Sequence, residues 1–430
     1  MLNISNIRNK NFNLGIVGMG RIGLPLAISF AIKGVRVLGV EKRAETLKLL
    51  KNAKTPFYEN GMQEALGKSL KSGKLSFVSD NEFNCENCHI IVVAVGTPLK
   101  ENLLPDMSLI VDVISRLSKQ AADDSIVILR STLVPGTTEN QLLPYIKKIN
   151  NSLHIAVCPE RIVEGNALKE IEELPEIIGT EHEAVGTLVR ELFLLLGPKE
   201  IAITNTKTAE AAKIFTNVYR YVTFALANEF ALISENLNID AKEAIQLANN
   251  GYLRSKIPVP GPSAGPCLRK DALFLSSSNS FINLSKVAWL LNESIPSHII
   301  DTIQRIYGTV VGKKIGVLGK TYKANIDDVR DSPAIRLIQE LEAKGAKVLS
   351  YDPYTSNTYA LEEVLDNEIV ILAVNHSFFD KITAEMLKRS KLVYDTWGQF
   401  SELHLESYGI KYISLGKGLW NRQELMMARY

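Results

Sequence analysis

The feature that most constrains the fold is a glycine pattern close to the N-terminus. Gly18, Gly20 and Gly23 form a G-x-G-x-x-G turn that follows an apolar run at residues 14–18 and opens a helical segment at residues 24–33. In that setting the glycines permit a tight turn, close approach of the backbone to a pyrophosphate and close helix packing, while helix N–H groups face the anion. The pattern predicts a dinucleotide-binding turn.

An acidic residue favours the same interpretation. A second strand, expected at residues 35–40, ends at Glu41. A carboxylate in that position can accept hydrogen bonds from both ribose hydroxyls and repels a 2′-phosphate. The segment therefore predicts a βαβ unit that binds NAD rather than NADP.

The alternation of strands and helices continues along the chain. Further strand-like apolar runs occur at residues 90–95, 126–129, 155–157, 176–179, 314–319, 346–351, 368–374, 392–394 and 412–415. Helical segments between such runs are typical of parallel sheets that are covered on both faces. We therefore expect an α/β protein with two Rossmann-like, doubly wound domains.

A long helical segment separates the two sets of strands. Residues 207–237 keep a helical period without a proline or glycine, which is longer than a usual globular helix. Such a helix is expected to join domains and to pack against a second copy of the chain. A loop rich in Pro, Gly and Ser at residues 257–266 interrupts the helical region, which resumes near Phe281. We thus expect three domains, with bounds 1–205, 206–305 and 306–430, the central one helical and dimeric.

Charge and hydropathy exclude several classes of partner. The 49 Lys and Arg residues against 47 Asp and Glu residues leave a net charge of +2, so nothing marks the chain for nucleic acid or membrane surfaces. The N-terminus is polar, and no later run approaches the roughly 18 apolar residues of a membrane-spanning helix. We expect a soluble, cytoplasmic protein.

The four cysteines are expected to be reduced thiols, because no secretion signal accompanies them. Cys85, Cys88 and His89 formally match a haem attachment pattern, but no second Cys pair exists and His89 leads directly into an apolar strand. Two incidental thiols and no metal are the favoured interpretation. Cys158 likewise resembles a small apolar residue at the end of a strand.

Cys267 differs from the others in its surroundings. It lies in the turn-rich segment Gly261–Asp271, where Gly and Pro favour a shaped cavity over core packing. A thiol can attack an aldehyde carbon, hold it covalently while a hydride leaves, and release an acid through a thioester. Together with the dinucleotide-binding turn, Cys267 predicts an aldehyde-level or four-electron oxidation.

Two pairs of polar residues are further candidates for the site. Lys213 and Asn217 stand four apart on one face of the long helix, with Glu210. This face could be solvated, or it could bury the ammonium and the amide as an oxyanion clamp. Glu160 and Glu164 follow a strand end, where ligands bind in α/β sheets.

Taken in order, eight blocks resemble the UDP-glucose/GDP-mannose dehydrogenase family, the nucleotide-sugar 6-dehydrogenases, over nearly the whole chain. They are GMGRIGLPLA (18–27), VGTPL (95–99), PDMS (105–108), RSTLVPGTTE (130–139), PERIVEG (159–165), AEAAKIFTN (209–217), the Cys267 loop, and GKTYKANIDDVRDSP (319–333). The resemblance implies an NAD-dependent, two-step oxidation of a sugar C6 alcohol to a carboxylate on a UDP-sugar. It also implies a C-terminal UDP-sugar-binding domain and a homodimer or higher oligomer.

The resemblance also implies a role for individual residues. Cys267 is similar to the nucleophile, Lys213 and Asn217 to the groups that hold the C6 oxygen, and Asp271 and Thr132 to those that position water. Glu164 would assist thioester hydrolysis, and the substrate contacts would be Glu160, Arg161, Lys213, Asn217, Lys323 and Arg254, the last donated across a dimer interface. The NAD contacts would be Gly18, Gly20, Arg21, Ile22, Gly23, Glu41, Thr97 and Thr132.

The chain departs from the family pattern at a few positions. Ala264 and Pro266 alter the loop before Cys267. An arginine usually follows shortly after the aspartate of the C-terminal strand block, whereas this chain has Tyr394-Asp395-Thr396-Trp397-Gly398. Arg161 and the Gly265-Pro266-Cys267 step look more like the N-acetylhexosamine branch, so UDP-N-acetyl-D-mannosamine is favoured over UDP-glucose or UDP-N-acetylglucosamine. A two-electron β-hydroxyacid dehydrogenase and a non-catalytic NAD- or nucleotide-sugar-binding protein are the competing hypotheses.

Overall fold

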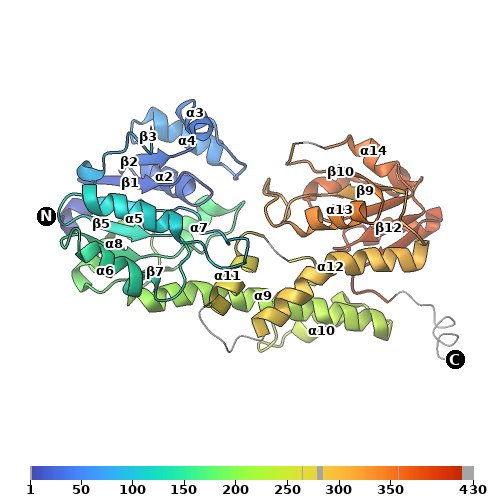
Figure 1. Ribbon diagram of the computed structural model, residues 1–430. Coiled ribbons are helices and arrows are strands. Elements are labelled where there is room, and N and C mark those ends of the chain that lie inside the picture. Colours follow the sequence, from blue (N-terminus) through green and yellow to red (C-terminus); the bar gives the residue numbers. More distant parts are fainter. Residues whose placement is uncertain (1, 264, 278–283, 357, 419–430) are drawn as a thin grey trace. The chain divides into compact units, whose positions relative to one another are not determined.

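The structure is a computed structural model that describes residues 2–263, 265–277, 284–356 and 358–418 (Figure 1). The chain divides into two compact units. The N-terminal unit runs to Thr216, with Ser277 added, and the C-terminal unit comprises the remainder from Asn217. Ala264 in the predicted loop and Phe281, near which the helical region was predicted to resume, lie outside the described residues.

The N-terminal unit is built on an eight-stranded sheet of order β3-β2-β1-β4-β5-β6-β7-β8. The strands are β1 (Asn13–Val17), β2 (Arg36–Glu41), β3 (Leu75–Ser79), β4 (Ile90–Val93), β5 (Ile126–Leu129), β6 (His154–Val157), β7 (Glu176–Gly179) and β8 (Ile201–Thr204). Ile16 of β1 aligns with Gly39 of β2 on one side and with Val92 of β4 on the other. The strand order therefore reverses at β1, the point where ligands bind in open α/β sheets.

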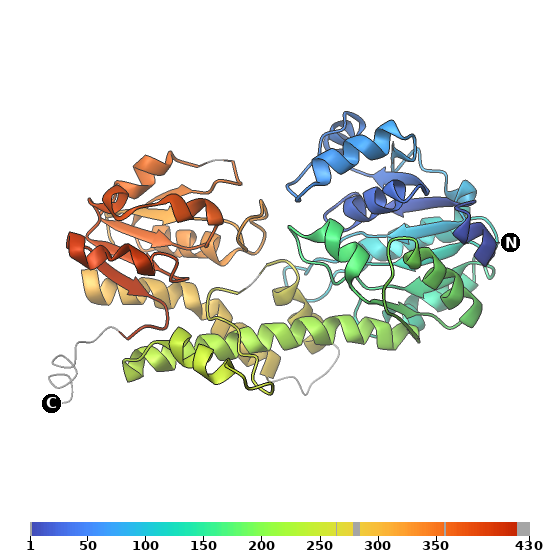
Figure 2. The ribbon, with the colours of Figure 1, turned by 180° about the vertical axis from the view of Figure 1, so that it is seen from behind.

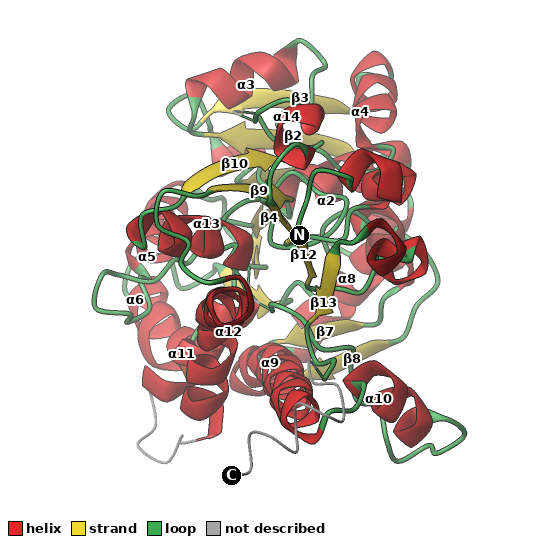
Figure 3. Ribbon diagram, turned by 90° about the vertical axis from the view of Figure 1, so that its right-hand side faces the viewer, coloured by secondary structure: helices red, strands yellow, loops and turns green. Residues whose placement is uncertain are grey.

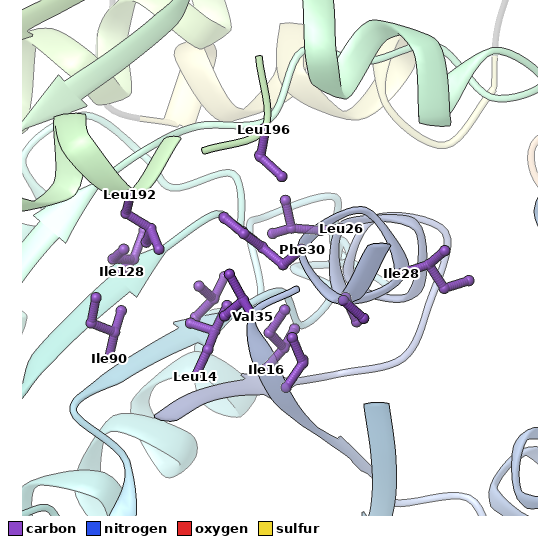
Figure 4. Packing of buried hydrophobic residues seen from close by; sticks show 14 of the residues in the cluster. Leu14, Ile16, Leu26, Ile28, Phe30, Val35, Ile90, Ile128, Leu192 and Leu196 are labelled. Atoms are coloured by element: carbon purple, nitrogen blue, oxygen red, sulfur yellow. The ribbon is translucent and has the colours of Figure 1, made fainter. Parts of the chain in front are cut away.

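Helices cover both faces of this sheet. They are α1 (Ile4–Arg8), α2 (Gly23–Ile32), α3 (Ala44–Lys51), α4 (Met62–Lys71), α5 (Ser108–Gln120), α6 (Leu143–Lys147), α7 (Ala167–Glu173) and α8 (Glu183–Leu194). Figure 4 shows one face, where strand residues such as Leu14 and Ile90 meet Phe30 of α2 and Leu192 of α8. Alternate strand residues such as Ile91 point to the opposite face and pack with α5 and α6. Because successive residues of a strand point to opposite faces of the sheet, the same strands contribute to two hydrophobic cores.

Two details of this sheet differ from the sequence prediction. The pair β6 and β7 is antiparallel, whereas the other pairs in the sheet are parallel. Parallel neighbours need a crossover that returns the chain to the start of the sheet, and α7, with seven residues, rises only about 10 Å. The strands β3 and β8 were not predicted, and both lie at sheet edges.

The predicted long helix is present as α9 (Thr206–Leu237), which runs without interruption in both views (Figures 1 and 2). Three further helices follow: α10 (Ala241–Asn249), α11 (Leu268–Ser277) and α12 (Leu284–Tyr307). Asp240 begins α10, because its side chain accepts hydrogen bonds from the backbone of Lys242 and Glu243.

The C-terminal unit contains a second, fully parallel sheet of order β10-β9-β11-β12-β13. Its strands are β9 (Lys314–Leu318), β10 (Lys347–Tyr351), β11 (Ile369–Leu372), β12 (Leu392–Asp395) and β13 (Lys411–Ser414), with helices α13 (Pro333–Ala343) and α14 (Leu361–Leu365). Val317 and Ile371 pack with α12 and α13 on one face, and Leu318 and Leu372 pack with α14 on the other. Figure 3 shows the strands in yellow and the helices in red. The predicted fold class, two doubly wound α/β domains with a long helix, is confirmed.

Candidate active site

The glycine turn after β1 has the geometry that a bound dinucleotide requires. Gly18 has φ +97°, and a Cβ there would lie 2.8 Å from the carbonyl oxygen of Ala94. A Cβ on Gly23 would overlap the carbonyl oxygen of Gly18, whereas a Cβ on Gly20 would meet no atom within 4 Å. Gly18 and Gly23 are therefore glycine because the fold requires it, and Gly20 leaves space that a pyrophosphate can occupy. The residues of this turn fit NAD.

Glu41 is fixed beside the turn. It is buried at the end of β2, and its Oε1 accepts a hydrogen bond from the backbone N–H of Arg43 at 2.8 Å. The preceding residue, Val40, accepts a hydrogen bond from the N–H of Gly18 at 2.9 Å. The carboxylate is thus held beside the glycine turn.

Other predicted residues of the N-terminal unit lie in contact with one another. The guanidinium of Arg21, in the glycine turn, lies 3.5 Å from the carboxylate of Glu164. Ile22 is the residue that precedes α2. The hydroxyl of Thr97 donates to the backbone oxygen of Thr132 at 2.8 Å. The structure therefore brings predicted cofactor and catalytic positions together in two pairs.

Glu160 and Arg161 are engaged within the protein. Glu160 is buried, forms an ion pair with Arg130, and accepts hydrogen bonds from the backbone of Arg161 at 2.7 Å and Ile162 at 3.0 Å. Burial opposes ionisation, but the Arg130 guanidinium prevails and lowers the pKa of Glu160. The Arg161 guanidinium donates to the carbonyl of Pro175. Glu160 thus holds the loop that leads to Glu164, and sequence reasoning missed its partner Arg130.

The polar face of α9 is buried rather than solvated. Lys213 and Asn217 are 8% and 4% exposed. Glu210, on the same face, accepts hydrogen bonds from the backbone of Gly136 at 2.6 Å and Thr138 at 2.9 Å. Burial raises the pKa of Glu210. Of the two interpretations open from the sequence, the structure supports burial of these groups.

In the C-terminal unit, the predicted catalytic residues around Cys267 lie in direct contact. The Asn217 amide donates to the carboxylate of Asp271 at 2.6 Å, and Asp271 is fully buried. The backbone N–H of Asp271 donates to the carbonyl of Cys267 at 2.9 Å, so the thiol residue stands at the start of α11. A helix N-terminus carries partial positive charge, which favours an anion such as a thiolate.

Cys267 is exposed, while the other three cysteines are buried, and none of the four forms a disulfide. Burial raises the pKa of Cys88 to about 11 and that of Cys158 well above its usual value, which makes both poor nucleophiles. No three His, Cys, Asp or Glu side chains among the described residues are arranged to hold a metal ion.

The segment 319–325 is held by a buried network that sequence reasoning missed. His376 accepts a hydrogen bond from the N–H of Asn325 at 2.8 Å, and its other nitrogen lies 3.1 Å from the carboxylate of Asp352. Asp352 also accepts the N–H of Lys320 at 2.6 Å. Lys323 lies in this hydrogen-bonded segment, and its side chain is exposed. Both network residues follow strand ends, the signal that singled out Glu160 and Glu164.

Two remaining positions have different surroundings. Arg254 is exposed, and its guanidinium lies 4.8 Å from the centre of the Tyr252 ring. Trp397 is held in place, because its indole N–H donates to the carbonyl of Ala373 at 2.9 Å.

Three domain models of one protein family match successive segments of the chain. Residues 12–196 match the NAD binding domain of the UDP-glucose/GDP-mannose dehydrogenase family, residues 207–292 its central domain and residues 316–402 its UDP binding domain. None of the helices in the described parts of the chain has the length and hydropathy needed to cross a lipid bilayer.

Individual relatives share nearly the full length. A UDP-N-acetyl-D-mannosamine dehydrogenase from Methanocaldococcus jannaschii is 30% identical over 94% of this chain and 96% of its own. One from Pyrococcus horikoshii is 32% identical over 89% of this chain and 94% of its own. A solved structure of a Pyrococcus horikoshii UDP-D-ManNAc dehydrogenase matches with a TM-score of 0.88 and 30% identity, covering 94% of this chain and 99% of that one.

The family models account for both α/β units and the helical segment that follows the N-terminal unit. The chain therefore belongs to the UDP-glucose/GDP-mannose dehydrogenase family and is a nucleotide-sugar dehydrogenase with an NAD binding domain.

Proposed function

We propose that the protein oxidises the C6 alcohol of UDP-N-acetyl-D-mannosamine to the uronic acid in an NAD-dependent, four-electron reaction. The names of the similar proteins support this sugar. The chemistry rests on one observation: an exposed thiol, Cys267, opens α11 one turn before a buried carboxylate, Asp271, which the Asn217 amide contacts at 2.6 Å.

The reaction requires two oxidations and one hydrolysis. NAD, one molecule for each oxidation, would accept the hydride that leaves C6. The first oxidation also removes the hydroxyl proton and leaves an aldehyde, to which the Cys267 sulfur adds to form a thiohemiacetal. Loss of the second hydride and of the hydroxyl proton converts the thiohemiacetal to a thioester. Water then cleaves the C–S bond, which releases the carboxylate and returns the thiol.

The other residues of the proposed site would stabilise the charge on the C6 oxygen or position the water. We assign Lys213 and Asn217 to the C6 oxygen, because a cation and an amide stabilise the oxyanion that forms at each stage. Asp271 and Thr132 would position the water, and Glu164 would accept its proton. The Arg21 guanidinium, 3.5 Å away, would hold the Glu164 carboxylate in position.

The remaining assignments concern substrate and assembly. Lys323 would bind the UDP-sugar, Glu160 and Arg161 would shape the sugar site, and Arg254 would reach a partner subunit. The proposed domains are residues 1–205 for NAD, 206–305 for dimerisation and the Cys267 loop, and 306–430 for UDP-sugar. Exposed apolar side chains on the central helices, Tyr219, Leu237, Leu247 and Leu290, support a homodimer. A cytoplasmic role in polysaccharide biosynthesis fits this product.

A substrate panel tests the proposal. The enzyme is incubated with NAD and UDP-N-acetylmannosamine, UDP-N-acetylglucosamine or UDP-glucose, and NADH and the sugar acid are both quantified. We expect the highest kcat/KM for UDP-N-acetylmannosamine, with two NADH for each acid formed, and no acid from Cys267→Ala. One NADH per substrate would contradict the four-electron reaction. Binding of NAD and UDP-sugar without NADH formation would indicate a non-catalytic protein.

A further inference from the structure

The loop that leads to Cys267 packs against a side chain that no part of the proposed chemistry uses. Trp397 follows β12, and three carbons of its indole lie 2.9 Å or less from the point where a Cβ on Gly261 would stand. Ordinary van der Waals contact between carbons begins near 3.5 Å. The indole therefore packs directly against the backbone of Gly261, at the start of the loop.

The indole is itself immobilised from two sides. Its N–H donates to the carbonyl of Ala373 at 2.9 Å, directly after β11. The backbone N–H of Trp397 donates to the carboxylate of Asp395 at 3.0 Å, and Asp395 is fully buried. Because the single polar atom of the ring is used by Ala373, the remaining contribution of Trp397 is a flat, rigid surface.

A second aromatic ring packs against the loop two residues before Cys267. A Cβ on Gly265 would lie 2.6 to 3.0 Å from three carbons of Tyr322. Gly265 has φ +95°, and its N–H donates to the carbonyl of Asp331 at 3.3 Å. Tyr322 immediately precedes Lys323, so this contact joins the loop to the proposed UDP-sugar segment.

The central helices hold the loop from the other side. The N–H of Gly261 donates to the side chain of Asn228 on α9 at 2.8 Å, and Asn228 donates to Asn292 on α12 at 2.9 Å. Both asparagines are buried. Gly261 therefore lies between a fixed amide and a fixed indole, with no room for a side chain.

We infer that Trp397 is a positioning residue for the nucleophile: with Tyr322 it forms an aromatic support on which Gly261 and Gly265 rest, and this support sets where α11 begins and where the thiol lies. The inference depends on the proposed role of Cys267. It follows that the C-terminal α/β domain would place the nucleophile as well as bind the nucleotide.

A double-mutant cycle tests this role. Gly261→Ala adds one methyl group against the indole, and the backbone at Gly261 has no left-handed strain that alanine could not accept. The methyl group must displace the loop by about 1 Å, a shift that can lower kcat roughly 100-fold. We expect that loss, with affinity for UDP within about twofold of wild type, because Lys323 and its segment are unchanged.

The partner variant is Trp397→Leu, which removes the ring. We expect a lower kcat from it alone, again with unchanged UDP affinity, and little further loss when Gly261→Ala is added, because the clash no longer exists. Gly67→Ala is the matched control: Gly67 lies in α4, has ordinary backbone angles, and a Cβ there meets nothing within 4 Å. It should leave kcat unchanged.

The outcomes separate this inference from the proposed function. Equal loss from Gly261→Ala in both backgrounds, or no loss in either, overturns the positioning role. If Gly261→Ala does not fold, the Trp397→Leu variant alone decides. A wild-type kcat in that variant contradicts the inference, and so does a loss of UDP affinity without a change in kcat. If Cys267→Ser still forms two NADH per acid, the proposed function fails instead.

Discussion

Replacing Arg130 by methionine should destabilise the N-terminal unit strongly. The Arg130 side chain is 3% exposed and pairs with Glu160 and, at 3.1 Å, with Glu176. Both carboxylates are also buried. Methionine fills a similar volume but leaves two buried carboxylates without their cation, a change that costs about 3 to 5 kcal/mol of unfolding free energy.

That loss can be converted to a melting temperature. For a unit of this size, 1 kcal/mol lowers the midpoint by about 2 to 4 °C, so Arg130→Met should lower it by about 6 to 20 °C. Differential scanning calorimetry of the full chain measures the shift. NAD identifies the relevant transition, because it stabilises only the unit that binds it.

Matched variants separate charge from packing. Arg130→Lys keeps the charge but cannot reach both carboxylates with a planar fork, so a smaller loss is expected. Arg130→Met combined with Glu160→Gln and Glu176→Gln removes the buried charges and should recover part of the stability. A shift below about 2 °C for Arg130→Met, or a triple variant less stable than the single one, would refute the reasoning.

Three further results are expected. Gly20→Ala should fold normally, since a Cβ there meets no protein atom, but should weaken NAD binding at least about tenfold in calorimetric titration; unchanged affinity would argue against a pyrophosphate at this turn. Iodoacetamide should alkylate Cys267 alone in the folded enzyme, because the other cysteines are buried, and peptide mass spectrometry that found a second labelled thiol would contradict this accessibility. Burial raises the pKa of Asp352, but the His376 hydrogen bond and the backbone donors together outweigh burial. The pKa of Asp352 is therefore lowered overall. The stability that Asp352 contributes is therefore present above the unfolded pKa of about 3.9 and is lost as pH falls through the folded value. Urea unfolding of Asp352→Asn at several pH values should show lower stability at pH 7 and a shallower acid decline; an unchanged slope would contradict the sign.

In the N-terminal sheet, the strands whose burial is complete were predicted and the two edge strands were not, although the partly exposed edge strands β10 and β13 of the second sheet were predicted. The central strands β4 and β5 are buried at every position, so each appears as a short, uninterrupted apolar run. The strands that were missed, β3 and β8, lie at the two edges of the sheet and are partly exposed. An edge strand buries less, and its apolar signal is correspondingly weaker. The long helix α9 was predicted because no proline or glycine interrupts its period.

In the candidate site, the sequence predicted the functional residues but not the contacts between them. The residue types and their spacing predicted which groups carry chemistry, and the helical period placed Lys213 and Asn217 on one face. The contacts could not be predicted, because they join distant positions: Asn217 reaches Asp271, 54 residues later, and Arg130 reaches Glu160, 30 residues later. Such pairings follow from the order of strands and helices in space, which local periodicity does not encode.

The most direct test of the account is to trap the covalent intermediate. Glu164→Gln should slow thioester hydrolysis, so acid quenching of this variant during turnover with NAD and UDP-N-acetylmannosamine should capture the acyl group. We predict a mass increase on the peptide that contains Cys267, sensitive to hydroxylamine and absent without substrate. Formation of two NADH per sugar acid by the wild-type enzyme, with no adduct on Cys267 in the quenched variant, would contradict the central claim.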